Sequence, residues 1–154
     1  MVVKMKKTMN EVAEIKVAYS TNDTPRIKIT SVDVAYKILL ASWDLDIIEL
    51  QEEFKILLLN RANEVLGLYP LSKGGITGTV VDQRLIFAVA LKCNATGIIM
   101  CHNHPSGKLS PSETDITLTK SIGKCADLLE INLLDHLIIT KNGFFSFSNQ
   151  GKLS

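Results

Sequence analysis

The chain has 154 residues, a length typical of one domain that can bury a core without disulfides or metals. Hydrophobic residues make up 46% of it and charged residues 21%, a composition that excludes a disordered tail, a collagen-like repeat and a coiled coil. The 17 Lys and Arg nearly balance the 16 Asp and Glu, and the resulting net charge of +1 argues against binding nucleic acid mainly through its phosphates.

The cysteine count and the lack of long apolar runs indicate in which compartment of the cell the protein is expected. Cys93, Cys101 and Cys125 form no CxxC pair, and an odd number cannot close a complete set of disulfides. The first ten residues contain Lys but no apolar run of signal-peptide length, and no stretch reaches the roughly 18 apolar residues of a membrane span. We therefore expect a soluble cytoplasmic protein that does not enter a membrane. The sequence does not indicate its oligomeric state.

The N-terminal part divides into an extension and the start of a domain. Residues 1–30 are expected to form the extension, in which Ile15, Val17 and Tyr19 share one parity and predict a peripheral strand. Ser31 is placed as the N-cap of a helix. The helix is predicted to carry an apolar stripe made of Val34, Ile38, Leu39 and Trp43.

The rest of the chain, 31–154, is expected to form one domain. Two apolar runs, 54–59 and 64–71, are separated by Arg61-Ala62-Asn63 and predict an antiparallel hairpin. A helix over 81–91 is predicted to pack through Leu85, Val89 and Leu91. Further along, we expect a buried strand at 97–101, a helix at 112–129 and strands at 133–140 and 144–147. This order predicts an α/β fold with a mixed, mostly antiparallel sheet flanked by helices.

One stretch combines residues typical of a metal site. A strand places residues two apart on the same face, so His102 and His104 can point together from the end of the 97–101 strand. The loop that follows is long enough to bring Asp115, in the first turn of the next helix, back to them as a third ligand. Two neutral His and one carboxylate with an open fourth position are the composition of a catalytic zinc site. Such a site lowers the pKa of bound water to about 7.

Each part of this stretch also has an ordinary structural interpretation. Ser112-x-x-Asp115 is a plausible capping pattern, which alone we would favour about four to one. Histidines at i and i+2 are surface or core residues about half the time. The two patterns together, at a strand end and a helix start, are far more specific, and they favour the metal site.

These residues resemble a known motif. His102-x-His104-Pro105, followed by Ser112 and Asp115, is similar to the JAMM (JAB1/MPN) metalloprotease motif. The wider context, with Leu134-Asp135-His136 and Phe145-Ser146-Phe147 downstream, resembles the DNA repair protein RadC family over roughly residues 31–150. Many RadC-like proteins carry a helix-hairpin-helix segment before this domain, and no such segment fits within residues 1–30, which weakens the expectation of a direct repair role.

The resemblance implies a cytidine-deaminase-like JAMM/MPN fold with Zn²⁺ held by His102, His104 and Asp115. It also implies that Ser112 stabilises the oxyanion and that a Glu on an upstream strand is the general base. Glu52 and Glu53 are both candidates. The family pattern and strand parity favour Glu52 by about two to one, because Glu52 shares a face with Phe54.

Three further features have two interpretations each. His136 is expected, about three to one, to be a hydrogen-bonded strand histidine, and a role next to the metal is the alternative. Cys101 points away from His102 on its strand and is expected to be packed. Gly74-Gly75-x-x-Gly78 lacks the spacing of a nucleotide loop and more readily serves a close backbone approach beside the substrate.

Three functions follow. The first is a zinc-dependent hydrolase that cleaves an amide bond in a peptide or protein substrate, by peptide or isopeptide cleavage. The alternative is a protein of DNA repair or recombination that binds a repair partner, or associates weakly with DNA, without proteolysis. The third is an interaction module without catalysis, which has no physical need for the full set of ligands, base and Ser.

Overall fold

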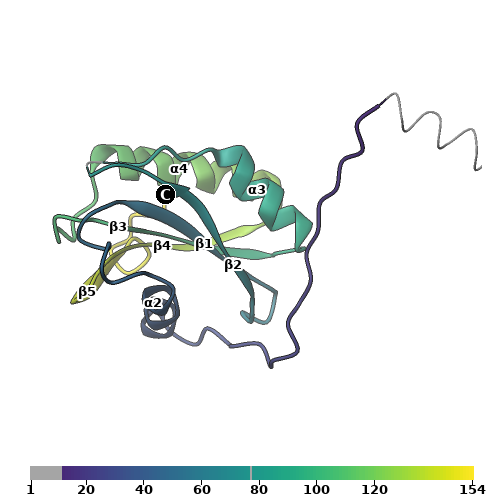
Figure 1. The fold of residues 1–154 in the computed structure, drawn as a ribbon, viewed down its shortest axis with the longest axis horizontal. Helices are drawn as coiled ribbons and strands as arrows, with labels where there is room; N and C mark the ends of the chain where they lie inside the picture. The colour runs from purple at the N-terminus through teal and green to yellow at the C-terminus, as the bar shows by residue number, and fades with distance from the viewer. Residues whose placement is uncertain (1–11, 77) are drawn as a thin grey trace, which may run out of the picture.

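The computed structural model describes residues 12–76 and 78–154, so the first part of the predicted extension, residues 1–11, lies outside the described residues. A single sheet lies between helix α2 on one face and helices α3 and α4 on the other (Figure 1). The helices are α2 (Val32–Ala41), α3 (Gln83–Lys92) and α4 (Glu113–Leu128), and the strands are β1 (Glu53–Leu59), β2 (Val65–Lys73), β3 (Gly97–Asn103), β4 (Asn132–Thr140) and β5 (Gly143–Ser146).

The strand order in the sheet is β2-β1-β3-β4-β5. The β1–β2 hairpin and the β1–β3 and β4–β5 pairs are antiparallel, whereas β3 and β4 run parallel. A parallel pair needs a crossover, and α4 supplies it between β3 and β4. The prediction of a mixed, mostly antiparallel sheet flanked by helices is confirmed.

The sheet separates two apolar cores. Alternation along the strands sends one set of side chains towards α3 and α4 and the other set towards α2. Cys101 belongs to the second set and has no exposed surface, as expected from its strand position. The first core includes Ile56, Leu58, Ile98 and Met100, and the second includes Leu57, Leu59, Ile99 and Leu39.

The cap predicted for α2 is confirmed, whereas its buried stripe matches the prediction only in part, because Trp43 lies beyond the end of the helix and Val34 and Ile38 are partly exposed. Ser31 caps α2, whose side chains Ala35 and Leu39 are buried. Helix α3 differs from the prediction, because Leu85 and Leu91 are 44% and 53% exposed. The buried stripe of α3 instead consists of Ile86, Phe87 and Ala90, and Leu85 and Leu91 lie on either side of it. Among the described residues, no helix is long and apolar enough to cross a membrane.

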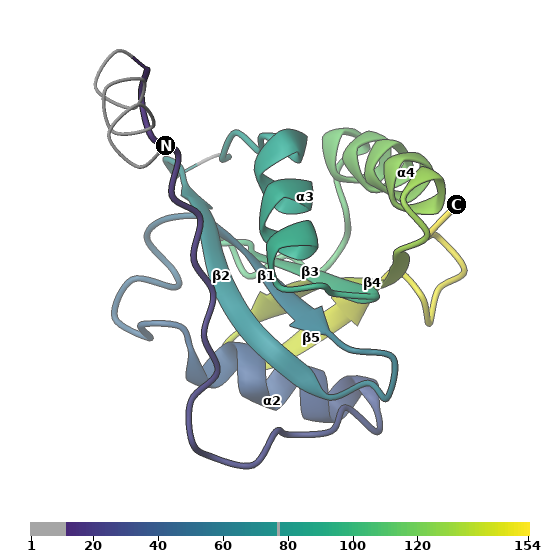
Figure 2. The ribbon, with the colours of Figure 1, turned by 90° about the vertical axis from the view of Figure 1, so that its right-hand side faces the viewer.

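The predicted peripheral strand at Ile15–Tyr19 is wrong. Residues 13–19 have no strand assignment, and the segment runs along β2 with Ile15 86% exposed (Figure 2). The Tyr19 hydroxyl donates a hydrogen bond to the Leu66 carbonyl oxygen at 2.7 Å. Backbone pairing with this sheet edge begins only at Lys28, which forms an isolated bridge with Glu64. Alternating side chains do not make a strand where the backbone does not join the ladder of hydrogen bonds.

Candidate metal centre

The two histidines of the motif lie at the C-terminal end of β3. His102 is 2% exposed, and its ring is stacked on Phe54 with centroids 5.9 Å apart. His104 follows the strand in a turn, where its Nδ1 lies 2.7 Å from the Lys108 carbonyl oxygen. A carbonyl oxygen only accepts hydrogen bonds, so Nδ1 of His104 carries the hydrogen. In the neutral ring, Nε2 of His104 is therefore a lone pair that faces His102.

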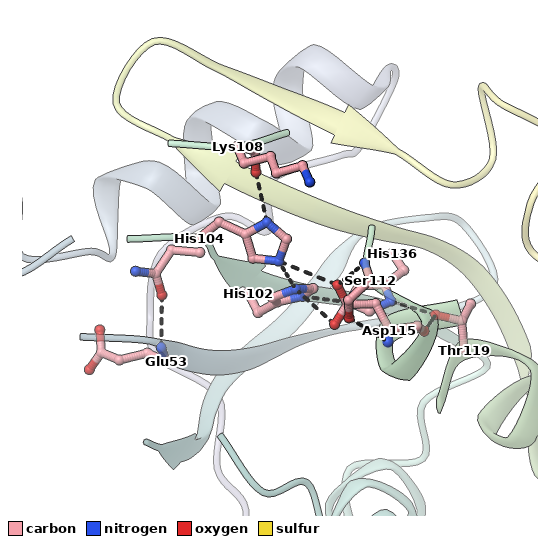
Figure 3. A network of polar contacts seen from close by, with 9 residues as sticks. Glu53, His102, His104, Lys108, Ser112, Asp115, Thr119 and His136 are labelled. Carbon is pink, nitrogen blue, oxygen red and sulfur yellow. Dashed lines mark hydrogen bonds and ion pairs between the residues drawn. The ribbon is translucent and has the colours of Figure 1, made fainter. Parts of the chain in front are cut away.

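Asp115 reaches these histidines from the first turn of α4. Its Oδ1 lies 3.3 Å from His102 Nε2 and its Oδ2 lies 3.3 Å from His104 Nε2 (Figure 3). The same carboxylate accepts a hydrogen bond from the Ser112 N–H at 2.8 Å, and the Ser112 Oγ accepts one from the Asp115 N–H at 3.1 Å. Both interpretations of Ser112-x-x-Asp115 therefore hold at once, since the capping box is present and it orients the carboxylate towards the histidines.

The spacing of these atoms fits a metal ion. The two Nε2 atoms are 3.0 Å apart, and each lies 3.3 Å from an Asp115 oxygen. In a tetrahedral site with N and O ligands at about 2.0–2.1 Å, neighbouring ligand atoms are separated by about 3.3 Å. A carboxylate and a lone pair at these distances repel each other unless a cation or a proton lies between them. The residues present thus have the chemistry and the spacing of a zinc site.

The pKa values in the metal-free protein reflect this crowding. Burial raises the pKa of Asp115, but its contacts with His102 and His104 outweigh burial and hold that pKa far below its usual range. Burial lowers the pKa of His104, but its contacts with Asp115 and with the Lys108 carbonyl outweigh that effect and raise it. A proton and a metal ion are therefore expected to compete for the same position.

Glu52 and Glu53 lie in different surroundings. Glu52 is 9% exposed, and its carboxylate lies with the His102 and His104 ring nitrogens in a group of atoms all within 4.8 Å of one another. Burial raises the pKa of Glu52, and the two histidines partly offset that effect. Glu53 forms an ion pair with Lys73 at 3.0 Å. Two carboxylates thus face the histidines, and the Asp115 oxygens lie 3.3 Å from the Nε2 atoms of the two rings.

The loop after β2 holds Glu52 in place. The Glu52 N–H donates to the Gly75 carbonyl at 3.1 Å, and the Gly74 N–H donates to the Glu52 carbonyl at 2.8 Å. The Thr79 backbone, from the same loop, lowers the pKa of Glu52 and so offsets part of the rise caused by burial. A Cβ on Gly74 would lie 2.1 Å from the Gly78 carbonyl oxygen, so only glycine fits there. The close backbone approach at the glycine run therefore serves Glu52.

Two residues behind His102 complete the polar cluster. The His136 Nε2 lies 2.8 Å from His102 Nδ1, and the His136 Nδ1 lies 2.7 Å from the Thr119 Oγ1. His136 is a hydrogen-bonded strand residue, which was the more favoured interpretation. One of its two partners is His102, so it also lies next to the candidate metal site, as the alternative had it. Thr119 was not singled out from the sequence. Its signal is that it follows Asp115 by four residues and so lies on the same helix face.

The chain is similar to known proteins over most of its length. Residues 29–152 match the family model described as RadC-like JAB domain. The chain is 51% identical over 100 residues to a UPF0758 protein of Flavobacterium johnsoniae. The aligned residues make up 65% of this chain and 44% of that protein. It is 39% identical over 133 residues to a UPF0758 protein of Staphylococcus epidermidis, covering 86% of this chain and 57% of that protein. The chain thus spans about half the length of the curated relatives it matches.

Proposed function

The chain belongs to the RadC-like JAB domain family, and on that premise we propose that it is a zinc-dependent hydrolase that cleaves an amide bond in a peptide or protein. One observation carries the proposal. Nitrogen and oxygen atoms of His102, His104 and Asp115 meet at 3.0–3.3 Å, with the Glu52 carboxylate beside them. A helix cap beside two idle histidines requires neither that spacing nor a buried carboxylate.

Each residue has a proposed role. His102, His104 and Asp115 would hold the zinc, which when bound supplies a Lewis acid that polarises a carbonyl group and lowers the pKa of water. The Glu52 carboxylate takes a proton from the attacking water and passes it to the leaving amine nitrogen. The raised pKa of Glu52 suits a group that must both accept and release a proton near neutral pH. The exposed Ser112 hydroxyl still has its hydrogen to donate to the developing oxyanion, since its Oγ is used as an acceptor by Asp115.

The surroundings of His104 offer room for a substrate. A cavity is lined by His104 together with Pro105, Leu109 and the β4–β5 turn. A larger cavity lies along β2 and α3, beside the segment that contains Tyr19, and none of the proposed site residues lines it. We place the substrate at the smaller cavity, because a reacting group has to reach the metal ligands.

Metal content tests the binding half of the proposal. We expect about one zinc per chain in the purified protein, measured by atomic emission, and loss of that zinc in His104→Ala and Asp115→Ala. The matched control is Asp127→Ala, which removes an exposed carboxylate from the same helix and should keep the zinc. Absence of zinc from the wild type, even after zinc is added, would overturn the proposal and favour the interaction module.

The base is tested separately from the metal. Glu52→Gln is expected to keep zinc and to lower the turnover of a peptide mixture, read by mass spectrometry of new amino termini, by about 10²–10⁴-fold. Glu53→Gln is the matched control, because Glu53 faces Lys73 instead of the histidines. Unchanged turnover in Glu52→Gln, or an equal loss in Glu53→Gln, would contradict the assignment of Glu52 as the base.

The DNA-associated alternative has a test of its own. The net charge of +1 favours a protein substrate over unassisted binding to phosphates. Binding of branched or single-stranded DNA that weakens steeply with salt would support the alternative, whereas binding that does not depend on salt would not. The chain spans about half of its relatives, so this test concerns the domain alone.

A further inference from the structure

The hydroxyl of Thr119 is the starting point, because the number of its hydrogens is fixed. Its Oγ1 lies 2.7 Å from the main-chain oxygen of Asp115 and 2.7 Å from the Nδ1 of His136. A hydroxyl has one hydrogen, and a carbonyl oxygen can only accept, so the Thr119 hydrogen points to Asp115. Towards His136 the hydroxyl can then only accept. It follows that Nδ1 of His136 carries a hydrogen.

The position of the hydrogen on His136 determines which nitrogen of His102 carries a hydrogen, because the two rings are hydrogen bonded. The His136 ring has no exposed surface, lies parallel to Phe147 at 4.7 Å, and meets Phe54 edge-on at 5.6 Å. A positive charge on this ring would be fully buried, and its two nitrogens contact a hydroxyl and another imidazole instead of a carboxylate, so the ring is neutral and has one N–H. Because that N–H is at Nδ1, the His136 Nε2 is an acceptor. The nitrogen 2.8 Å from it, Nδ1 of His102, must therefore be the donor.

We propose that His136 and Thr119 are positioning residues that hold His102 in the Nδ1–H tautomer and so present its Nε2 lone pair to the metal. This inference rests on the proposed function. The chain of hydrogen bonds runs from the main-chain oxygen of Asp115 through Thr119 and His136 to His102, whose Nε2 lies 3.3 Å from the carboxylate of the same Asp115. His104 receives the same tautomer from the Lys108 carbonyl. Each of the two imidazole ligands therefore has its own acceptor, one a main-chain carbonyl and the other a buried histidine.

A purely structural role for His136 makes a different prediction. If the ring only fills space between Phe54 and Phe147, its removal changes stability but not the proton on His102. If it fixes the tautomer, breaking the chain at Thr119 changes the nitrogen that carries the His102 hydrogen. Metal ligands lose about 10–100-fold in affinity when the group that orients them is removed. Thr119→Val removes the hydroxyl at nearly constant volume, and Thr119→Ser keeps it.

The experiment reads the tautomer directly, in protein without metal. Long-range ¹H–¹⁵N correlation spectra of the full chain at about pH 8 should show His102 as the Nδ1–H tautomer in the wild type and in Thr119→Ser. Thr119→Val should give a mixture, because His136 can then turn its hydrogen towards His102. The matched control is Thr117→Val, on the exposed side of the same helix. A wild-type spectrum with the hydrogen on His102 Nε2 would overturn the inference without any variant.

Zinc affinity is the second measurement, by competition with a chromogenic chelator. The dissociation constant is expected to rise about 10–100-fold in Thr119→Val and in His136→Phe, and to stay within about 3-fold in Thr119→Ser and Thr117→Val. A folded Thr119→Val protein with wild-type affinity and tautomer would overturn the inference and leave the proposed function standing. A wild type that binds no zinc would overturn the proposed function, and the tautomer spectrum would still decide the inference.

Discussion

Asn103 and His102 are neighbours in β3 and point to opposite faces of the sheet, and their buried polar atoms differ in hydrogen bonding. Asn103 points towards α2, where its amide donates to the Ile48 and Gln51 carbonyls at 2.8 and 2.9 Å and its Oδ1 accepts from the Glu53 N–H at 2.7 Å. His102 points towards α4, where its Nε2 meets another ring nitrogen and a carboxylate.

The comparison distinguishes polar groups that stabilise the fold from polar groups that are arranged to bind something. On the α2 face the donors of Asn103 and Lys55 have acceptors. The Lys55 Nζ donates to the Ser42 carbonyl at 2.7 Å and lies 4.2 Å from the centre of the Trp43 ring, whose own Nε1 has no hydrogen-bond partner among the described residues. On the α4 face the Nε2 atoms of His102 and His104 and the Asp115 carboxylate are all acceptors, and they face one another. Polar groups that satisfy each other stabilise a fold, whereas converging lone pairs require something else to bind between them.

The largest expected effect comes from Asn103 itself. Asn103→Ala removes the partners of two carbonyls and one N–H, and it is expected to lower the free energy of unfolding by about 3–5 kcal/mol. His104→Ala, in metal-free protein, is expected to change it by less than about 1 kcal/mol, because it removes one of several crowded acceptors. Urea denaturation of both variants measures the difference. Similar losses in the two would break the comparison.

The apolar cores should not differ in this way. Leu39→Ala on the α2 face and Ile86→Ala on the α3 side both empty a fully buried position, and each is expected to cost about 2–4 kcal/mol. Leu85→Ala, at a 44% exposed position beside Ile86, is the control and should cost less than about 0.5 kcal/mol. Thermal and urea unfolding measure all three. A large loss at Leu85 would contradict the observed stripe of α3.

The loop that holds Glu52 should depend on one glycine and not on its neighbour. Gly74→Ala places a Cβ 2.1 Å from the Gly78 carbonyl oxygen, and it is expected to cost about 1–3 kcal/mol and to impair Glu52. Gly75→Ala meets no atom within 4 Å and should be nearly neutral. Unfolding and peptide turnover are the measurements. Equal behaviour of the two variants would show that the loop does not position Glu52.

The smallest effect is expected at the Glu53–Lys73 ion pair. Lys73 is 51% exposed in its side chain, and exposed ion pairs contribute less than about 1 kcal/mol. Lys73→Ala should therefore alter neither stability beyond that amount nor turnover. Added salt should erase the small difference in urea denaturation. A loss of turnover in Lys73→Ala would place Glu53 in the chemistry and weaken the choice of Glu52.

The elements that were predictable from sequence are those whose surroundings are uniform. β3 is buried along its whole length, so its apolar run predicts a central strand without further information. The Ser31 cap and the β1–β2 hairpin follow from local turn and cap chemistry. The pattern around Leu85 leaves the centre of the stripe open, because Leu85, Val89 and Leu91 are all apolar and only packing selects Ile86. In the segment around Ile15, apolar and polar side chains alternate, but the backbone of residues 13–19 is not part of the sheet.

The residues of the candidate site were predictable from the sequence, but the hydrogen bonds that connect them were not. The motif spacing brings His102, His104 and Asp115 together as expected, while their roles remain predictions. The pairing of β3 with β4 places Met100 opposite His136, and this register brings His136 behind His102. Register and the docking of α4 are tertiary features, so the sequence alone could not connect Thr119 to His136. For Glu52, the deciding observation is that Glu53 has Lys73 as a partner.

The double use of Asp115 has a consequence for how the protein can vary. One carboxylate both caps α4 and faces the histidines, so a substitution there shortens the helix whether or not a metal is bound. Mutational scanning for abundance alone should therefore report Asp115 as intolerant, while His104 should tolerate change in the same screen. Folding therefore constrains Asp115 whether or not the proposed metal binds, whereas His104, which caps no helix, would be constrained by function alone.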